Sequence, residues 1–81
     1  MIQIYSKNNC QFCDKAKGLL DLKGVKYDVI KIDEDNNARE FMLAEGHRSV
    51  PQIYIDGVLL EGGYTGLVKQ SPEFFDKLKK D

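Results

Sequence analysis

MIQIYSKNNCQFCDKAKGLLDLKG (residues 1–24) predicts a strand, a short loop and a helix. Residues 1–6 alternate in a way that favours a strand, and Lys7-Asn8-Asn9 then interrupts the pattern. Over residues 11–23 the apolar side chains recur at helical spacing, and Gly24 stands where a left-handed C-terminal cap belongs. The apolar positions of this predicted helix are Phe12, Ala16, Leu19 and Leu20.

Strands and helices continue to alternate after this unit. Residues 26–33 (KYDVIKID) are β-branched and alternating, which indicates a second strand. Asn36 or Asn37 is the expected cap of a second helix that would end at Gly46. The residues expected to share one face of that helix are Ala38, Phe41, Met42 and Glu45.

The pair Asp56-Gly57 predicts a β-hairpin between residues 51–55 and 58–61, because both residues of such a turn must tolerate positive φ. Gly62-Gly63 ends the second strand. One or two helical turns are expected from Thr65. A last helix should follow, capped by Ser71, with Pro72 at its first position and Phe74, Phe75 and Leu78 on its buried face.

The order β-α-β-α-β-β-α predicts an α/β fold. A strand–helix–strand unit implies parallel pairing through a right-handed crossover, and the hairpin adds an antiparallel pair. We therefore expect a four-stranded mixed sheet flanked by helices, in a single domain over residues 1–81. A domain of this size buries about 60–65% of the surface that its unfolded chain exposes.

Composition describes an ordinary globular protein, with 42% apolar and 31% charged residues. The net charge of −1 argues against nucleic acid as a partner. An acidic run, Asp33-Glu34-Asp35, and the basic end, Lys77-Leu78-Lys79-Lys80, are interpreted as solvated surface. No secretory signal or membrane-spanning run is recognisable, so we expect a cytoplasmic protein without membrane contact.

Both cysteines fall at the start of the first predicted helix. Cys10 at the first position and Cys13 within the first turn can meet on one face, a spacing that permits a disulfide. Free backbone N–H groups and the helix dipole favour a thiolate at Cys10, and Lys7 adds a nearby positive charge. Since the thiolate is the nucleophile in thiol–disulfide exchange, we predict that Cys10 attacks and that Cys13, deeper in the helix, resolves.

Other readings of the pair stay open. A structural zinc site needs four ligands, whereas the chain offers Cys10, Cys13 and His47. A metal or cluster shared between two chains, or two inert buried cysteines, would also fit the spacing. In a reducing cytosol a permanent disulfide is disfavoured, so the pair is expected to be redox-active or metal-binding.

Three segments resemble the glutaredoxin family, in the small form found in bacteria and their viruses. They are residues 5–13 (YSKNNCQFC), 49–53 (SVPQI) and 62–64 (GGY), in the family's order and spacing. The resemblance implies a thioredoxin-like fold. It also implies reduction of protein disulfides and glutathione mixed disulfides, with glutathione as co-substrate and no metal.

Family position also implies a set of roles. Pro51 would follow a cis peptide bond and leave the Val50 backbone free to pair with the cysteinyl part of glutathione. Tyr64 and Thr65 would contact the γ-glutamyl end, next to the close-packing glycines 62 and 63. Lys7 and Arg48 are candidates to receive the glycine carboxylate. The full glutathione-binding set predicted is Lys7, Phe12, Arg48, Ser49, Val50, Pro51, Gly63, Tyr64 and Thr65.

The remaining aromatic and titratable residues receive no chemical role. His47 is assigned to a surface loop, and Tyr27 and Tyr54 to the core or a sheet face.

Two departures from the family pattern affect the site. Gln11-Phe12 stands between the cysteines where glutaredoxins commonly have Pro-Tyr, which keeps a ring but loses a hydroxyl and a residue preset for the first helical turn. After Tyr64, Thr65-Gly66 replaces the acidic pair of many members.

Three further functions are weighed beside this one. One is a glutaredoxin-like redoxin that thioredoxin reductase reduces and that serves ribonucleotide reductase, although such proteins tend to carry a tryptophan that this chain lacks. Another is an iron–sulfur cluster carrier in which two chains and two glutathiones hold the cluster through Cys10. The last is a plain interaction domain. We expect a monomer that acts on disulfide proteins, with ribonucleotide reductase as a candidate target.

Overall fold

The computed structural model describes residues 1–79, which form four strands and four helices. Their bounds are β1 (Ile2–Ser6), α1 (Gln11–Leu22), β2 (Asp28–Lys31), α2 (Asn36–Ala44), β3 (Gln52–Ile55), β4 (Val58–Leu60), α3 (Gly63–Val68) and α4 (Pro72–Lys79). This order confirms the predicted succession of strands and helices. None of the helices in this part of the chain is long and apolar enough to cross a membrane.

The strands form one mixed sheet in the order β2-β1-β3-β4. β1 pairs parallel with β2, so that Gln3 lies opposite Asp28, and antiparallel with β3, so that Gln3 lies opposite Tyr54. The β3–β4 hairpin turns at Asp56 and Gly57, both at positive φ, as the sequence predicted. Because β1 and β3 run antiparallel with Tyr5 opposite Gln52, the end of β1 and the start of β3 lie side by side.

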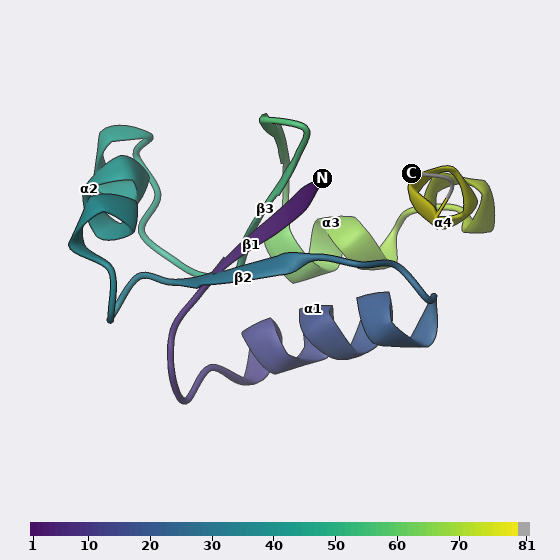
Figure 1. The fold of residues 1–81 in the computed structure, drawn as a ribbon, viewed down its shortest axis with the longest axis horizontal. Helices are drawn as coiled ribbons and strands as arrows, with labels where there is room; N and C mark the ends of the chain where they lie inside the picture. Colours follow the sequence, from purple (N-terminus) through teal and green to yellow (C-terminus); the bar gives the residue numbers. More distant parts are fainter. Residues whose placement is uncertain (80–81) are drawn as a thin grey trace.

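The two faces of the sheet bury different side chains. Alternation along β1 sends Ile2, Ile4 and Ser6 to one face, which α1 and α3 cover, and Tyr5 to the other. On the second face the rings of Tyr5, Phe41 and Tyr54 lie with centroids 5.4–5.6 Å apart. Figure 1 shows α1 and α2 on opposite sides of β2. The buried core of the first face comprises Ile2, Ile4, Ala16, Leu20, Val25, Ile53, Leu67 and Phe75.

Local structure differs from the predictions at the start of α2. The cap is Asp35, whose Oδ1 accepts a hydrogen bond from the Ala38 backbone N–H at 3.1 Å, so the prediction of Asn36 or Asn37 was wrong. Of the residues predicted to share one face of α2, Ala38 and Met42 are buried, and Phe41 is 39% exposed but packs its ring against Tyr5 and Tyr54. Glu45 is the C-cap and is exposed.

The other differences lie at ends and in the first turn of α1. β2 spans Asp28–Lys31 rather than residues 26–33, because it pairs only with residues 3–6 of β1. Phe12 is 53% exposed and does not join the core. In the basic end, Lys77 and Lys79 are exposed, and Lys80 lies outside the described residues.

Gly66 in α3 is required by a close approach of the backbone. A Cβ atom built at this position would lie 1.9 Å from the carbonyl oxygen of Glu61, which directly follows β4. We therefore expect Gly66→Ala to lower the free energy of unfolding by about 3 kcal/mol, measured by urea denaturation, because neither backbone segment can move without displacing the other.

Gly18→Ala is the matched control for this substitution. Gly18 lies in α1, is exposed, and would place a Cβ with nothing within 4 Å. Alanine should raise stability there by about 0.5–1 kcal/mol through its better helix propensity. A gain in stability from Gly66→Ala like that of the control would contradict the packing argument.

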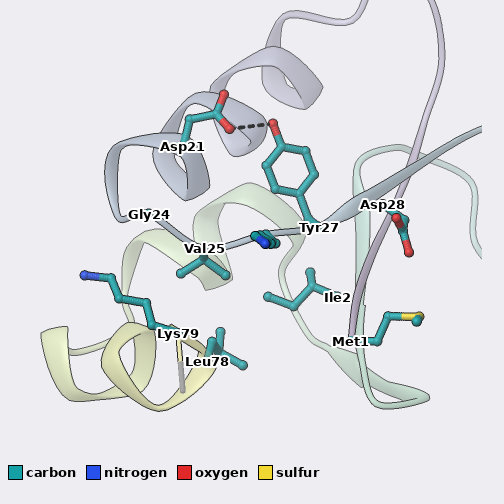
Figure 2. Close-up of a pocket in the computed structure, with 10 residues that line it drawn as sticks. Met1, Ile2, Asp21, Gly24, Val25, Tyr27, Asp28, Leu78 and Lys79 are labelled. Carbon is teal, nitrogen blue, oxygen red and sulfur yellow. Dashed lines mark hydrogen bonds between the residues drawn. The ribbon is translucent and has the colours of Figure 1, made fainter. Parts of the chain in front are cut away.

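Tyr27 forms a hydrogen bond from its hydroxyl to Asp21 Oδ1 at 2.9 Å, which Figure 2 shows. Burial, followed by this hydrogen bond and the charge of Asp21, raises the pKa of Tyr27 to about 12. Because the folded pKa lies above the ordinary value of 10.0, the contribution of Tyr27 to stability is complete below pH 10 and falls as the pH rises toward 12.

We expect Asp21→Asn to lower the pKa of Tyr27 toward 10.0. Ultraviolet absorbance of the tyrosinate, with Tyr27→Phe subtracted, measures it. Asp14→Asn removes another α1 carboxylate, one paired with Lys17, and should leave the titration unchanged. Identical titrations of Tyr27 in the wild type and in Asp21→Asn would show that the carboxylate does not influence it.

Candidate active site

Cys10 is the N-cap of α1. Its backbone is extended (φ −118°, ψ 107°), and its Sγ accepts a hydrogen bond from the Cys13 backbone N–H at 3.2 Å. The two cysteines form a disulfide, with Cα atoms 5.2 Å apart. Cys10 is 9% exposed and Cys13 is fully buried. In the reduced protein a negative sulfur at position 10 would therefore face an N–H donor and the positive end of the helix.

The segment before β3 faces the cysteines. The Val50–Pro51 peptide bond is cis, as the resemblance implied, and the Val50 carbonyl oxygen lies 3.9 Å from Cys10 Sγ. Gly63 at the start of α3 packs directly on this segment, because a Cβ there would lie 2.6 Å from the Pro51 carbonyl oxygen. Its positive φ of +55° adds a second reason for glycine. Segments distant in sequence thus meet around one sulfur.

A cleft of about 420 Å³, here named the proline cleft, collects most of the predicted glutathione-binding residues. The Phe12 ring forms one wall, and its centroid lies 6.0 Å from the centroid of the Tyr64 ring. The Lys15 ammonium lies 5.1 Å from the Phe12 centroid. An aromatic and partly cationic border suits a peptide-like, anionic ligand. The residues lining the proline cleft are Phe12, Ser49, Val50, Pro51, Gln52, Gly62, Gly63, Tyr64 and Thr65.

Lys7 and Arg48 do not line the proline cleft. Both border an adjoining hollow of about 170 Å³, here named the cation hollow, which shares Ser49 and Val50 with the cleft. The cation hollow is lined by Lys7, Ile32, Arg39, Met42, Leu43, His47, Arg48, Ser49 and Val50. The predicted set is thus divided between two hollows that meet at Val50.

Arg39 is a lining residue that the sequence reasoning missed. It lies on α2, three and four residues before Met42 and Leu43, so helical spacing places all three on neighbouring positions. A positive side chain at helical spacing from Met42 is the sequence signal that could have indicated Arg39.

The resemblance implied that Thr65 contacts the γ-glutamyl end of glutathione. The Thr65 hydroxyl donates to the Gly62 carbonyl oxygen at 2.7 Å. The donor is therefore used inside α3, and the oxygen can only accept from a ligand. The first backbone N–H groups of α3 remain suited to a carboxylate, since they have no partner within the helix.

His47 is half-buried rather than free on the surface. Its Nε2 lies 2.8 Å from the Tyr54 hydroxyl, which donates to Glu45 Oε1 at 3.4 Å. Burial, and then the Glu45 carboxylate, raises the pKa of Tyr54. The loop that leads to Val50 is thereby joined to β3.

A larger hollow, of about 920 Å³, lies at the other end of α1 (Figure 2). Ile2, Val25 and Leu78 provide apolar lining, and Tyr27 and Asp28 border it. Since α1 has 12 residues and rises about 1.5 Å per residue, roughly 18 Å separates this hollow from the cysteines. It is too distant to take part in chemistry at Cys10.

The chemistry available at the site is thiol–disulfide exchange. Cys10 keeps 9% of its surface exposed at a helix N-terminus that would favour an anion in the reduced protein, and Cys13 lies within bonding distance but is closed to solvent. Among residues 1–79, no group of three or more His, Cys, Asp or Glu side chains could hold a metal ion.

Comparison with known proteins gives consistent likenesses. The glutaredoxin family model matches residues 2–60. A probable glutaredoxin of Synechocystis is 51% identical over 57 residues, which cover 68% of this chain and 65%, slightly under two thirds, of that protein.

Two solved structures are similar over nearly the whole chain. A buckwheat glutaredoxin–glutathione complex superposes with a TM-score of 0.72 at 24% identity, covering 98% of this chain and 72% of the other. The glutaredoxin-like NrdH-redoxin of Escherichia coli, described as having a thioredoxin-like activity profile, gives a TM-score of 0.73 at 25% identity, covering 95% and 92%. These likenesses show the thioredoxin-like fold that the sequence predicted.

Proposed function

The chain belongs to the glutaredoxin family, and on that premise we propose that it is a glutathione-dependent thiol–disulfide oxidoreductase. The observation that carries the proposal is the position of Cys10. Its sulfur caps α1, accepts the Cys13 N–H and faces the segment that contains the cis proline. In the reduced protein the N–H donor and the helix dipole would favour the thiolate, and the remaining 9% exposure of Cys10 is where a substrate sulfur would approach.

The proposed reaction begins when the Cys10 thiolate attacks a substrate sulfur and expels a thiolate. For a glutathione mixed disulfide, this step leaves one glutathione bonded to Cys10. A second glutathione then attacks the sulfur of the bound glutathione, which releases the Cys10 thiolate and forms glutathione disulfide. For a protein disulfide, Cys13 attacks Cys10 instead, releases the second substrate thiol and leaves the Cys10–Cys13 disulfide. Two glutathiones then reduce that disulfide.

The two hollows suggest how glutathione lies. Its cysteinyl backbone would pair with Val50, where the proline cleft and the cation hollow meet. The γ-glutamyl carboxylate would lie by the first N–H groups of α3, near Tyr64. The glycine carboxylate would then reach the cation hollow and its three positive side chains, Lys7, Arg39 and Arg48. The buckwheat relative that was solved with glutathione supports this ligand class.

A coupled assay tests the proposal. With one small mixed-disulfide substrate, we compare glutathione plus glutathione reductase against thioredoxin reductase as the source of electrons. Turnover should occur with the first and not with the second. Turnover with thioredoxin reductase alone would replace the proposal with the redoxin function below.

The second candidate is a redoxin that takes electrons from thioredoxin reductase and supplies ribonucleotide reductase. Two observations favour it: the likeness to the Escherichia coli NrdH-redoxin, and Gln11-Phe12 in place of the common Pro-Tyr. The absence of tryptophan counts against it. In either case we propose that the protein works as a monomer on disulfide proteins in the cytoplasm, because a reducing compartment is needed to regenerate the dithiol.

A further inference from the structure

We propose that the cation hollow selects protein disulfides in which acidic residues follow the attacked cysteine. This inference rests on the proposed function and names its protein substrates by their chemistry. It concerns Lys7, Arg39 and Arg48, three positive side chains that border one hollow beside the reactive sulfur.

These three cations are available to a ligand. Within residues 1–79 none of them takes part in an ion pair. Lys17 and Lys31, by contrast, are paired with Asp14 and Glu34. In the described part of the chain, Lys7, Arg39 and Arg48 are therefore three unpaired cations that line one hollow.

The acidic run Asp33-Glu34-Asp35 does not line this hollow. Asp33 Oδ2 accepts the Asn8 backbone N–H at 2.9 Å, Glu34 is held by Asn8 and Lys31, and Asp35 caps α2. None of these three carboxylates lines the cation hollow. Among the described residues, the lining of the cation hollow thus carries three positive side chains and no carboxylate, although the whole chain carries −1.

The position of Val50 sets the direction of a bound chain. Val50 borders both hollows, and its carbonyl oxygen lies 3.9 Å from Cys10 Sγ. If a substrate cysteine pairs there as proposed for glutathione, the residues before it run toward α3 and those after it run over the cation hollow. Aspartate or glutamate in the following positions would meet Lys7, Arg39 and Arg48, whereas lysine would be repelled.

The experiment is a single-turnover reduction by pre-reduced protein, without glutathione. The substrates are homodisulfides of short peptides, acetylated and amidated so that their termini carry no charge. One peptide has two aspartates after the cysteine, one has two aspartates before it, and one has two lysines after it. Each reaction balances: the Cys10–Cys13 dithiol gives two electrons, ends as the disulfide and releases two peptide thiols.

We expect the peptide with aspartates after cysteine to react about tenfold faster than the peptide with lysines after it, at low salt, and about two- to threefold faster in 0.5 M salt. The double variant Arg39→Gln/Arg48→Gln should reduce the low-salt preference to about twofold. Lys77→Gln changes the charge of an exposed α4 residue outside the hollow and should keep the tenfold preference.

Three results would overturn the inference: equal rates for the peptides, an unchanged preference in the arginine double variant, or an equal advantage for aspartates before the cysteine. Glutathione-coupled turnover measured in parallel separates the two proposals. Normal glutathione turnover without a peptide preference overturns this inference alone. A peptide preference without glutathione turnover overturns the glutathione dependence alone.

Discussion

Cys10→Ser is expected to abolish turnover with every disulfide substrate, a loss on the order of a thousandfold or more relative to the wild type. A serine hydroxyl remains protonated at neutral pH, and no oxygen analogue of the mixed disulfide can form by exchange. The measurement is the glutathione-coupled rate at equal protein concentration, corrected for the reaction of glutathione alone. Retained turnover would remove Cys10 from its role as nucleophile.

This variant should fold as well as the wild type. Serine is among the preferred N-cap residues, and its oxygen can accept the Cys13 N–H that Cys10 Sγ now accepts at 3.2 Å. We therefore expect its thermal midpoint to equal or exceed that of the reduced wild type. A loss of activity with an unchanged midpoint then reports chemistry rather than unfolding.

Cys13→Ser is expected to separate the two activities. Reduction of glutathione mixed disulfides should continue, because a second glutathione can release Cys10 without help from Cys13. Reduction of protein disulfides should fall by at least about a hundredfold, because the buried sulfur that resolves the intermediate is gone. The covalent intermediate through Cys10 should accumulate and be visible by mass spectrometry.

Cys13→Ala is a second variant for the same prediction. A serine hydroxyl at this fully buried position costs about 1–3 kcal/mol if it finds no partner, whereas alanine adds no polar group. Both variants should give the same split between substrates. Equal losses on the two substrate classes would contradict the assignment of Cys13 as the resolving thiol.

The features predicted well from the sequence depend on neighbouring residues. The hairpin needs only Asp56 and Gly57, and α4 needs Ser71, which accepts the Phe74 N–H at 3.3 Å, and Pro72. The cap of α2 was missed because Asp35, Asn36 and Asn37 are three capping residues in a row. Only the path of the chain decides which of them lies outside the first turn.

The features predicted less well depend on tertiary contacts. Arg39 was missed, because its place beside Lys7 and Arg48 in the hollow that adjoins the proline cleft depends on how α2 packs. The Thr65 hydroxyl is taken by Gly62, a contact that exists only once α3 begins there. The sequence did not indicate that position 66 requires glycine, because the requirement comes from the carbonyl oxygen of Glu61 in the folded chain.

The burial of Cys13 beneath Cys10 also determines what peroxide does to the reduced protein. Peroxide would convert the Cys10 thiolate to a sulfenic acid. A sulfenic acid with no thiol nearby can be oxidised further to sulfinic and sulfonic acids, which is irreversible. We expect the Cys13 thiol beneath Cys10 to condense with the sulfenic acid, expel water and give the same Cys10–Cys13 disulfide. Peroxide would then leave Cys10 in a form that a thiol reductant can reverse.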